Sequence, residues 1–230
     1  MKDQYNRFKD ALWFSEETVG CLIGGAGGIG SWLSVLLARA GFKIYLYDYD
    51  EVEDHNRGGQ LYRTEDVGKP KVEAIADVCK AFCDTEINVF NEKLDENSMA
   101  HKYSFGAFDN MNARKSLFDL WKTTVEDNPD AILIDGRLSM ESLQIFCVTP
   151  SNMQQYEEHL FPDSDVEEQA CTLKQTSHTA SIIGGLMTAF FTNHITNVVE
   201  DDNIRRVPFY YEMFLPMALT IDKDEHSITE

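Results

Sequence analysis

Short apolar runs alternate with amphipathic stretches through the first 135 residues of this 230-residue chain. The runs have the length of buried strands, and the stretches between them have helical spacing. This alternation is typical of a parallel, doubly wound sheet. We expect helices at Tyr5–Phe14, Gly28–Ala40, Lys69–Ala81 and Asn110–Lys122, and strands at Val19–Ile23, Phe42–Tyr47, Ile87–Phe90, Ser104–Phe108 and Ala131–Ile134.

The pattern changes after residue 135. Leu143–Val148 follows the fifth strand so closely that an antiparallel hairpin is expected. Thr149–Ala170 is polar and acidic and is predicted to be a long loop. An apolar helix over Ser177–Val199 and two strands, Val207–Phe214 and Met217–Ile221, complete the prediction. The fold class is therefore α/β: a Rossmann-like, doubly wound, mostly parallel sheet, extended by antiparallel strands in the C-terminal half.

A glycine-rich turn, Gly24-Gly-Ala-Gly-Gly-Ile-Gly30, joins the first predicted strand to its helix. Gly25, Gly27 and Gly30 occupy the positions of a G-x-G-x-x-G motif. The first allows the turn, the second lets a phosphate approach the backbone, and the third lets helix and strand pack closely. The helix N-terminus offers unpaired N–H groups to an anion. Asp48 ends the second strand, where a carboxylate accepts hydrogen bonds from ribose, so the pattern predicts a site for NAD or ATP.

Three ordered stretches follow the glycine turn. They are Asp48-Tyr-Asp50-Glu-Val52-x-x-x-Asn56-x-x-x-Gln60, Asp66-Val-Gly68-Lys69-Pro-Lys71 and Asp109-Asn110-x-x-x-Arg114. With the turn, they resemble the ThiF/MoeB/HesA superfamily, the adenylate-forming proteins related to ubiquitin-activating enzymes. The resemblance covers roughly Tyr5 to Val199. It implies ATP and Mg²⁺ as cofactors and, as partner, a small ubiquitin-like protein or peptide with a free C-terminus.

The resemblance also implies roles for single residues. Asp48 would bind ribose, Asn56 and Lys71 would contact phosphate, and Asp109 would bind magnesium. Asp50, Gln60, Asn110 and Arg114 lie in the same motifs and are expected to contact the nucleotide. Adenylation chemistry agrees, because it needs a cation on the phosphates and a carboxylate for the metal. Simpler alternatives are an exposed helix lysine for Lys71 and a helix N-cap for Asp109.

Two arginine positions bear on this resemblance. The family often reads N-x-x-R-Q, and here Gly59 stands where that phosphate-binding arginine would be. Arg57 is a candidate replacement. Tyr5-Asn6-Arg7 resembles the family's N-terminal Y-x-R motif, whose arginine reaches the ATP of a neighbouring subunit. By this resemblance, Arg7 would contact the ATP bound to a second copy of the chain, which implies a homodimer. The alternative is that Arg7 is an exposed surface arginine.

The second half carries two further candidate stretches. Cys171-Thr-Leu-Lys174-Gln-Thr looks like the segment that holds the thioester cysteine of ubiquitin-type activating enzymes. A thiol near a helix N-terminus and a lysine is a good nucleophile, and the alternative is a structural thiol. Asp135-Gly136-Arg137 resembles the family's segment near the substrate's C-terminal glycines, where Arg137 could hold a carboxylate or phosphate with two donors.

Composition and charge narrow the class of protein. The net charge of -19 argues against a general nucleic-acid binder, and it suits either solubility or a basic partner. No run of about 18 apolar residues is present, so we expect no membrane association. The N-terminus lacks the apolar core of a signal peptide. The five cysteines are an odd count, so we expect free thiols and a cytoplasmic location.

These observations predict an ATP-dependent adenylyltransferase that activates a C-terminal carboxylate, with Cys171 as a possible thioester carrier. We expect a single adenylation domain over residues 1–230, with a nucleotide-binding half at about 1–135 and a substrate half, including the long loop, at about 136–222. Two other functions stay open. One is a nucleotide-binding module of the same fold with weakened catalysis, and the other is an NAD-dependent oxidoreductase.

Overall fold

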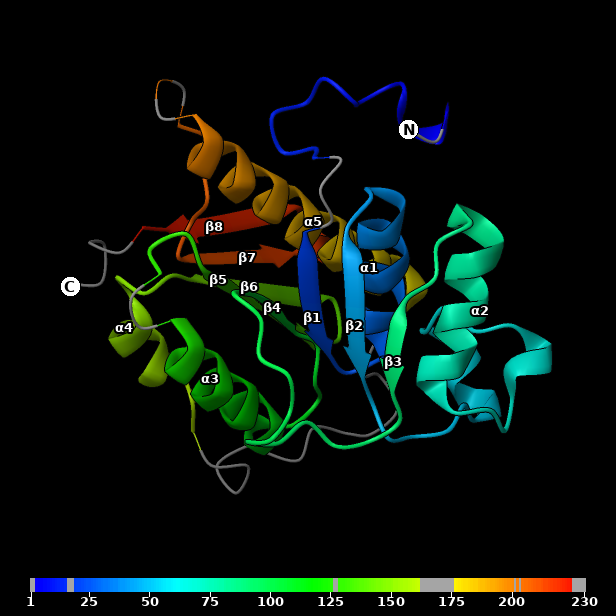
Figure 1. Cartoon of the computed structure of the whole chain (residues 1–230). Coiled ribbons are helices and arrows are strands. Elements are labelled where there is room, and N and C mark those ends of the chain that lie inside the picture. The colour runs from blue at the N-terminus through cyan, green and yellow to red at the C-terminus, as the bar shows by residue number, and fades with distance from the viewer. Residues whose placement is uncertain are drawn as a thin grey trace.

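The computed structural model describes residues 3–15, 19–125, 128–161, 176–200, 202 and 204–224. In this part of the chain eight strands form one sheet in the order β3-β2-β1-β4-β5-β6-β7-β8 (Figure 1). The parallel strands are β1 (Gly20–Gly24), β2 (Lys43–Tyr47), β3 (Asn88–Phe90), β4 (Tyr103–Gly106) and β5 (Ile132–Ser139). The antiparallel strands are β6 (Ser142–Val148), β7 (Tyr210–Phe214) and β8 (Leu219–Lys223). The predicted fold class is confirmed.

Helices cover both faces of the parallel strands. On one face lie α1 (Gly28–Arg39), α2 (Lys71–Cys83) and α5 (Ser177–Val199), and on the other lie α3 (Met111–Val125) and α4 (Met153–Glu157) (Figure 1). By length and composition α5 is apolar enough to cross a membrane. In this fold its Ile183, Met187 and Phe191 are fully buried in the core.

The strand register fixes where a ligand site can form. From β1 the chain winds toward β2, and from β4 it winds toward β5, so the switch point of the sheet lies between β1 and β4. Ligands of open α/β sheets bind at the carboxyl ends of the strands at such a point. Gly24, Gly106 and Asp135 are level across β1, β4 and β5. Beyond Asp135, β5 continues to Ser139 and pairs only with β6.

Two predicted elements are wrong. Tyr5–Phe14 is a chain of turns after a 3-10 helix at Asp3–Tyr5, with successive hydrogen bonds from Phe8 N–H to Tyr5, from Ala11 to Phe8 and from Phe14 to Ala11. The three-residue apolar spacing thus gathers the aromatic rings of this segment without an α-helix. The segment expected to be a loop over Thr149–Ala170 contains α4. Its last part, from residue 162, lies outside the described residues.

Candidate functional site

The glycine turn packs tightly on one side and is open on the other. Gly25 has a φ of 95°, and a Cβ on Gly30 would lie 1.8 Å from the carbonyl oxygen of Gly25. Neither position accepts a side chain without a shift of the backbone. A Cβ on Gly27 would meet nothing within 4 Å. Because α1 begins at Gly28 and no side chain caps it, its first N–H groups are available to an anion.

Asp48 fastens this turn to the end of β2. Its Oδ2 accepts a hydrogen bond of 2.7 Å from the Ala26 N–H, and its Oδ1 accepts one of 2.8 Å from the Asp50 N–H. Burial raises the pKa of the Asp48 carboxyl, and the two amide hydrogen bonds oppose that rise. The Tyr62 hydroxyl, which no sequence motif marks, donates to the Ala26 carbonyl at 2.5 Å. The ribose-binding role of Asp48 stays a prediction.

Lys71 and Asp50 form an ion pair beside the glycine turn. The Lys71 Nζ lies 2.7 Å from the Asp50 Oδ2, and the Lys71 N–H donates to the Asp50 carbonyl at 2.9 Å. The Lys71 side chain is 10% exposed, whereas that of Asp50 is 49% exposed. Lys71 opens α2, so the helix start and the end of β2 hold the ammonium group at the carboxyl edge. The exposed-lysine alternative for Lys71 is therefore wrong.

The segment between β2 and α2 places Asn56, Gly59 and Gln60. The Asn56 Oδ1 accepts from the Glu53 N–H at 2.8 Å and caps a 3-10 helix at Asp54–Gly58. The Gly59 carbonyl accepts from the Trp32 Nε1 at 3.3 Å. The Gln60 Oε1 is buried and has no hydrogen-bond partner among the described residues. Such an atom is costly to leave unpaired, so it is a position where a ligand donor would be favourable.

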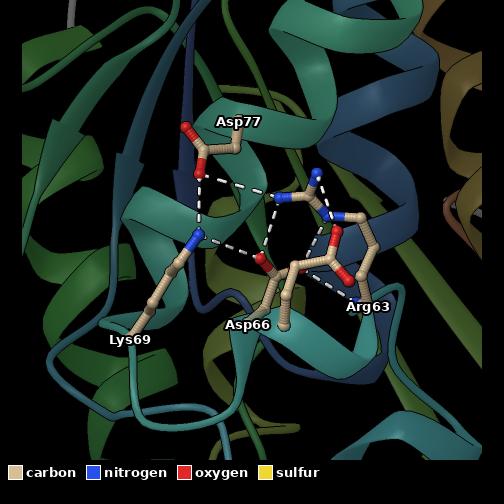
Figure 2. A network of polar contacts seen from close by, with 5 residues as sticks. Arg63, Asp66, Lys69 and Asp77 are labelled. Carbon is tan, nitrogen blue, oxygen red and sulfur yellow. Dashed lines mark hydrogen bonds and ion pairs between the residues drawn. The ribbon is translucent and has the colours of Figure 1, made fainter.

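A charge network holds the rest of this segment against α2 (Figure 2). Asp66 is fully buried and accepts from the Arg63 N–H, Nε and Nη2 at 2.8 to 2.9 Å and from the Lys69 Nζ at 3.3 Å. Lys69 also bonds Asp77 of α2 at 3.1 Å. Burial alone would raise the pKa of Asp66, but the hydrogen bonds from Arg63 and Lys69 outweigh it and hold the pKa below its ordinary value.

Asp66→Asn should therefore destabilise the fold by about 2 kcal/mol at pH 7, because charge-assisted hydrogen bonds to a buried carboxylate are lost. The folded-state pKa is the lower one, so this stabilisation is present above the unfolded-state value of about 3.9. It disappears as the pH falls through the folded-state pKa. Urea unfolding of both proteins across pH 3 to 7 measures the difference, which should shrink only at the acid end.

Asp77→Asn is the matched control, because Asp77 contacts the same two cations from an exposed position. Its effect should stay below about 0.5 kcal/mol. A cost for Asp66→Asn no larger than that of Asp77→Asn, or one unchanged between pH 7 and pH 3, would contradict the assignment of this network as a buried anchor.

Asp109 and Asn110 stand at the start of α3. The Asn110 Oδ1 accepts from the Ala113 N–H at 2.8 Å, and the Asn110 Nδ2 donates to the Asp109 Oδ1 at 3.2 Å. Asn110 is thus the residue whose side chain caps the helix, and the cap alternative for Asp109 is wrong by one position. The Asp109 carboxylate is exposed just past the carboxyl end of β4, where it is accessible to a metal ion.

Arg114 is buried with Asp135. Its guanidinium is 6% exposed, its Nη1 bonds the Asp135 Oδ1 and the Gly136 carbonyl, and its Nη2 bonds the Phe108 carbonyl. The predicted contact between Arg114 and nucleotide would have to compete with these partners. The Phe108 ring packs against the start of the glycine turn, since a Cβ on Gly24 would lie 2.4 Å from that ring. Arg114 therefore links α3, β5 and the glycine turn.

Arg137 shares Asp135 with Arg114. Its Nε donates to the Asp135 Oδ2 at 2.8 Å, its Nη1 donates to the His159 carbonyl at 3.2 Å, and its guanidinium lies 4.5 Å from the Phe146 ring centroid. The Tyr156 hydroxyl also donates to the Asp135 Oδ2. The Arg137 Nη2 is buried without a partner among the described residues. The nitrogen left for a substrate is thus Nη2, and the predicted two-donor contact of Arg137 stays a prediction.

The remaining predicted residues lie apart from this group. Arg7 is exposed in the N-terminal turns. Cys171 lies outside the described residues, and so does Lys174 beside it. Arg57, the candidate replacement for the missing arginine, pairs with Asp54 at 2.5 Å. A cleft of about 250 Å³ lined by Cys147, Asn152 and His194 lies near the amino end of β5, at the opposite edge of the sheet from the glycine turn.

Comparison with known proteins places the chain in a family. The model of the ThiF family matches residues 6–219. A ubiquitin-like modifier-activating enzyme 5 from Caenorhabditis elegans is 38% identical over 78 residues, 33% of this chain and 18% of that protein. Its counterpart from Drosophila willistoni is 30% identical over 124 residues, 54% of this chain and 26% of that protein. The match thus spans about a quarter or less of the length of these relatives.

Solved structures share the fold over nearly the whole chain. A crystal structure of PaaA has a TM-score of 0.68 at 22% identity, and the match covers 96% of this chain and 68% of the PaaA chain. The structure of Escherichia coli MccB with ATP has a TM-score of 0.69 at 16% identity, with coverages of 98% and 72%. These likenesses show the fold. The family model, which matches from the N-terminal turns into β8, shows that the chain belongs to the ThiF family.

Proposed function

We propose that this chain is an ATP-dependent adenylyltransferase that activates the C-terminal carboxylate of a small ubiquitin-like protein or a peptide. One observation carries the proposal: the open glycine turn, Lys71 and Asp109 converge on the carboxyl ends of β1, β2 and β4 around the switch point. The names of the similar proteins support it, because they include ubiquitin-like modifier-activating enzymes and MccB structures with ATP and with MccA.

The donors present fit ATP with a magnesium ion. Mg²⁺ in nucleotide sites is commonly held by one or two carboxylates together with phosphate oxygens. Asp109 offers one such carboxylate, and Asn110 steadies it through the 3.2 Å hydrogen bond. The described residues hold no cluster of three or more His, Cys, Asp or Glu side chains that could bind a metal on their own. When bound, the ion would neutralise charge on the phosphates.

In the adenylation step, the bonds that form and break belong to the substrate and ATP, and not to the protein. A carboxylate oxygen of the substrate forms a bond to the α-phosphorus of ATP, and the bond from that phosphorus to the pyrophosphate oxygen breaks. The products are an acyl adenylate and pyrophosphate. The N–H groups at the start of α1 stabilise the phosphate charge. Lys71 does the same once its Nζ exchanges Asp50 for a phosphate oxygen.

Among the residues that the structure describes, the site of one subunit is short of free positive charge. Lys71 is paired with Asp50, Arg57 with Asp54, and Arg114 with Asp135, and Gly59 replaces the family arginine. We therefore propose that Arg7 of a second copy completes the site, which its exposure in the N-terminal turns permits. The same shortage favours the second candidate function, a nucleotide-binding module with weakened catalysis. The thioester role of Cys171 stays part of the proposal.

Calorimetric titration of wild type and Asp109→Ala with ATP·Mg, with ATP in EDTA and with NAD tests the proposed function. Wild type should bind ATP about tenfold more tightly with magnesium, and Asp109→Ala should lose that dependence, because one carboxylate–metal contact is worth about that factor. Asp119→Ala, an exposed carboxylate farther along α3, should behave as wild type. Binding of NAD alone, indifferent to Asp109, would overturn the proposal and favour the oxidoreductase.

A further inference from the structure

One face of the antiparallel part of the sheet carries a row of three polar side chains and one apolar side chain. Directly paired residues of antiparallel strands point to the same side. Arg137, Gln144, Glu212 and Ile221 are paired in this way across β5, β6, β7 and β8. This is the side on which α4 packs, because the Tyr156 hydroxyl bonds Asp135 two residues before Arg137 (Figure 1).

Glu212 is the charged centre of this row. Its Oε1 accepts from the Ser142 Oγ at 3.2 Å and from the Gln144 Nε2 at 3.1 Å, and its Oε2 accepts from the Tyr210 hydroxyl at 2.9 Å. All three donors are neutral, and no lysine or arginine among the described residues pairs with the half-buried carboxylate. Lys223 lies on the same face, opposite Tyr210, but forms no ion pair with Glu212. Glu212 is therefore a fixed negative charge without an ion-pair partner among the described residues.

Exposed apolar side chains lie beside Glu212 on the same face. Phe214 pairs with Leu219 in the next row, and Ile221 lies opposite Glu212. These three side chains are 39%, 50% and 41% exposed. We name the surface made by Arg137, Gln144, Glu212, Phe214, Leu219 and Ile221 the tail face. It combines one anionic position with an apolar strip, which suits a peptide that carries both a basic and an apolar side chain.

The tail face begins next to the adenylation site. Asp135 is level with the last residue of β4, and Arg137 is two residues farther on, so its unpartnered Nη2 lies at the carboxyl edge of the sheet. From there Glu212 is two strands away. Neighbouring strands are about 4.8 Å apart, so Arg137 and Glu212 are about 10 Å apart across the sheet. An extended peptide covers that distance with about three residues.

We propose that the tail face binds the segment preceding the substrate's C-terminus, and that Glu212 selects a lysine or arginine there. That residue lies about three positions upstream of the one that contacts Arg137. The inference rests on the proposed function and adds the chemistry of its substrate: a C-terminal tail with a basic residue at a defined position. The charge of -19 on the chain would favour the encounter with such a tail.

A positional library of nonapeptides with free C-termini tests this inference. The immobilised full chain captures the peptides in the presence of magnesium and an ATP analogue with a methylene group between the α and β phosphorus atoms. Wild type should enrich lysine and arginine at one position about tenfold. Glu212→Gln should abolish that enrichment, and Glu212→Lys should replace it with aspartate and glutamate. Asp222→Asn removes one negative charge from the other face of β8. This variant should retain the enrichment of lysine and arginine.

Three results would overturn the role of the tail face. The wild-type chain captures no peptide, it captures peptides without enriching lysine or arginine, or the enrichment persists in Glu212→Gln. Thermal unfolding of each variant shows that it is folded. Titration of the wild-type chain with ATP·Mg separates this failure from that of the proposed function, since a chain that binds ATP·Mg but shows no basic preference contradicts only the tail face.

Discussion

Lys71→Ala should bind ATP·Mg about 10- to 100-fold more weakly than the wild-type chain, while it unfolds at nearly the same temperature. A charge-assisted contact to phosphate is worth about 1.5–3 kcal/mol, and each 1.4 kcal/mol is a factor of ten in affinity. The fold should tolerate the change because Asp50, which would lose its partner, is half exposed and stays hydrated. Calorimetric titration and thermal unfolding measure the two effects.

Catalysis should suffer more than binding in the same variant. Charge on the leaving pyrophosphate grows in the transition state, so loss of one preorganised donor costs about 10²–10³ in rate. Exchange of labelled pyrophosphate into ATP with the nonapeptide pool measures this. Lys80→Ala is the matched control, because Lys80 is an exposed lysine on the same helix, paired with Asp84. Equal rates for Lys71→Ala and wild type would remove Lys71 from the site.

Asp50→Asn separates the two partners of the Lys71 ion pair. The free ammonium group should then meet ATP without first leaving a carboxylate, so affinity for ATP without magnesium should rise by a few fold. A fall in affinity would instead mean that Asp50 holds Lys71 in its productive position.

The sequence predicted where the candidate residues lie wherever chain order determines position in space. A parallel sheet brings the carboxyl ends of its strands to one edge, so the glycine turn after β1, Asp48 after β2 and Asp109 after β4 had to meet there. The same logic predicted the β5–β6 hairpin, which the register confirms. Local pattern and topology were sufficient for these features because each needs only strand order and the residue that follows a strand.

Partners chosen by tertiary packing could not be predicted in this way. Arg114 was expected to face the nucleotide, but Asp135, 21 residues away in sequence, binds its guanidinium in the core. Tyr156 reaches Asp135 from α4, a helix of only five residues inside a segment that was predicted to be a loop. Glu212 carries no motif, and two of its three hydrogen-bond partners lie 68 and 70 residues away. A polar residue reveals its role only when its neighbours are known.

Asp135→Asn should be the most damaging single substitution proposed for this chain, with a loss of about 3–5 kcal/mol in the free energy of unfolding. Asp135 is 1% exposed and lies between Arg114 and Arg137. An amide of the same shape cannot compensate two largely buried guanidinium groups, so the cost comes from leaving those charges uncompensated. For a chain of this size the melting temperature should fall by about 10 °C, and urea unfolding measures the free energy.

A double-mutant cycle with Arg114→Met shows whether charge is the cause. If an unpaired guanidinium makes Asp135→Asn costly, removing Arg114 as well should relieve part of the loss, and the double variant should be more stable than the sum of the single effects predicts. Asp119→Asn breaks the exposed pair between Asp119 and Lys115 on the same helix as Arg114 and should cost less than about 0.5 kcal/mol. Strict additivity of Asp135→Asn and Arg114→Met would mean that Asp135 stabilises the fold through shape, and the electrostatic link from α3 through β5 to the glycine turn would then have no support.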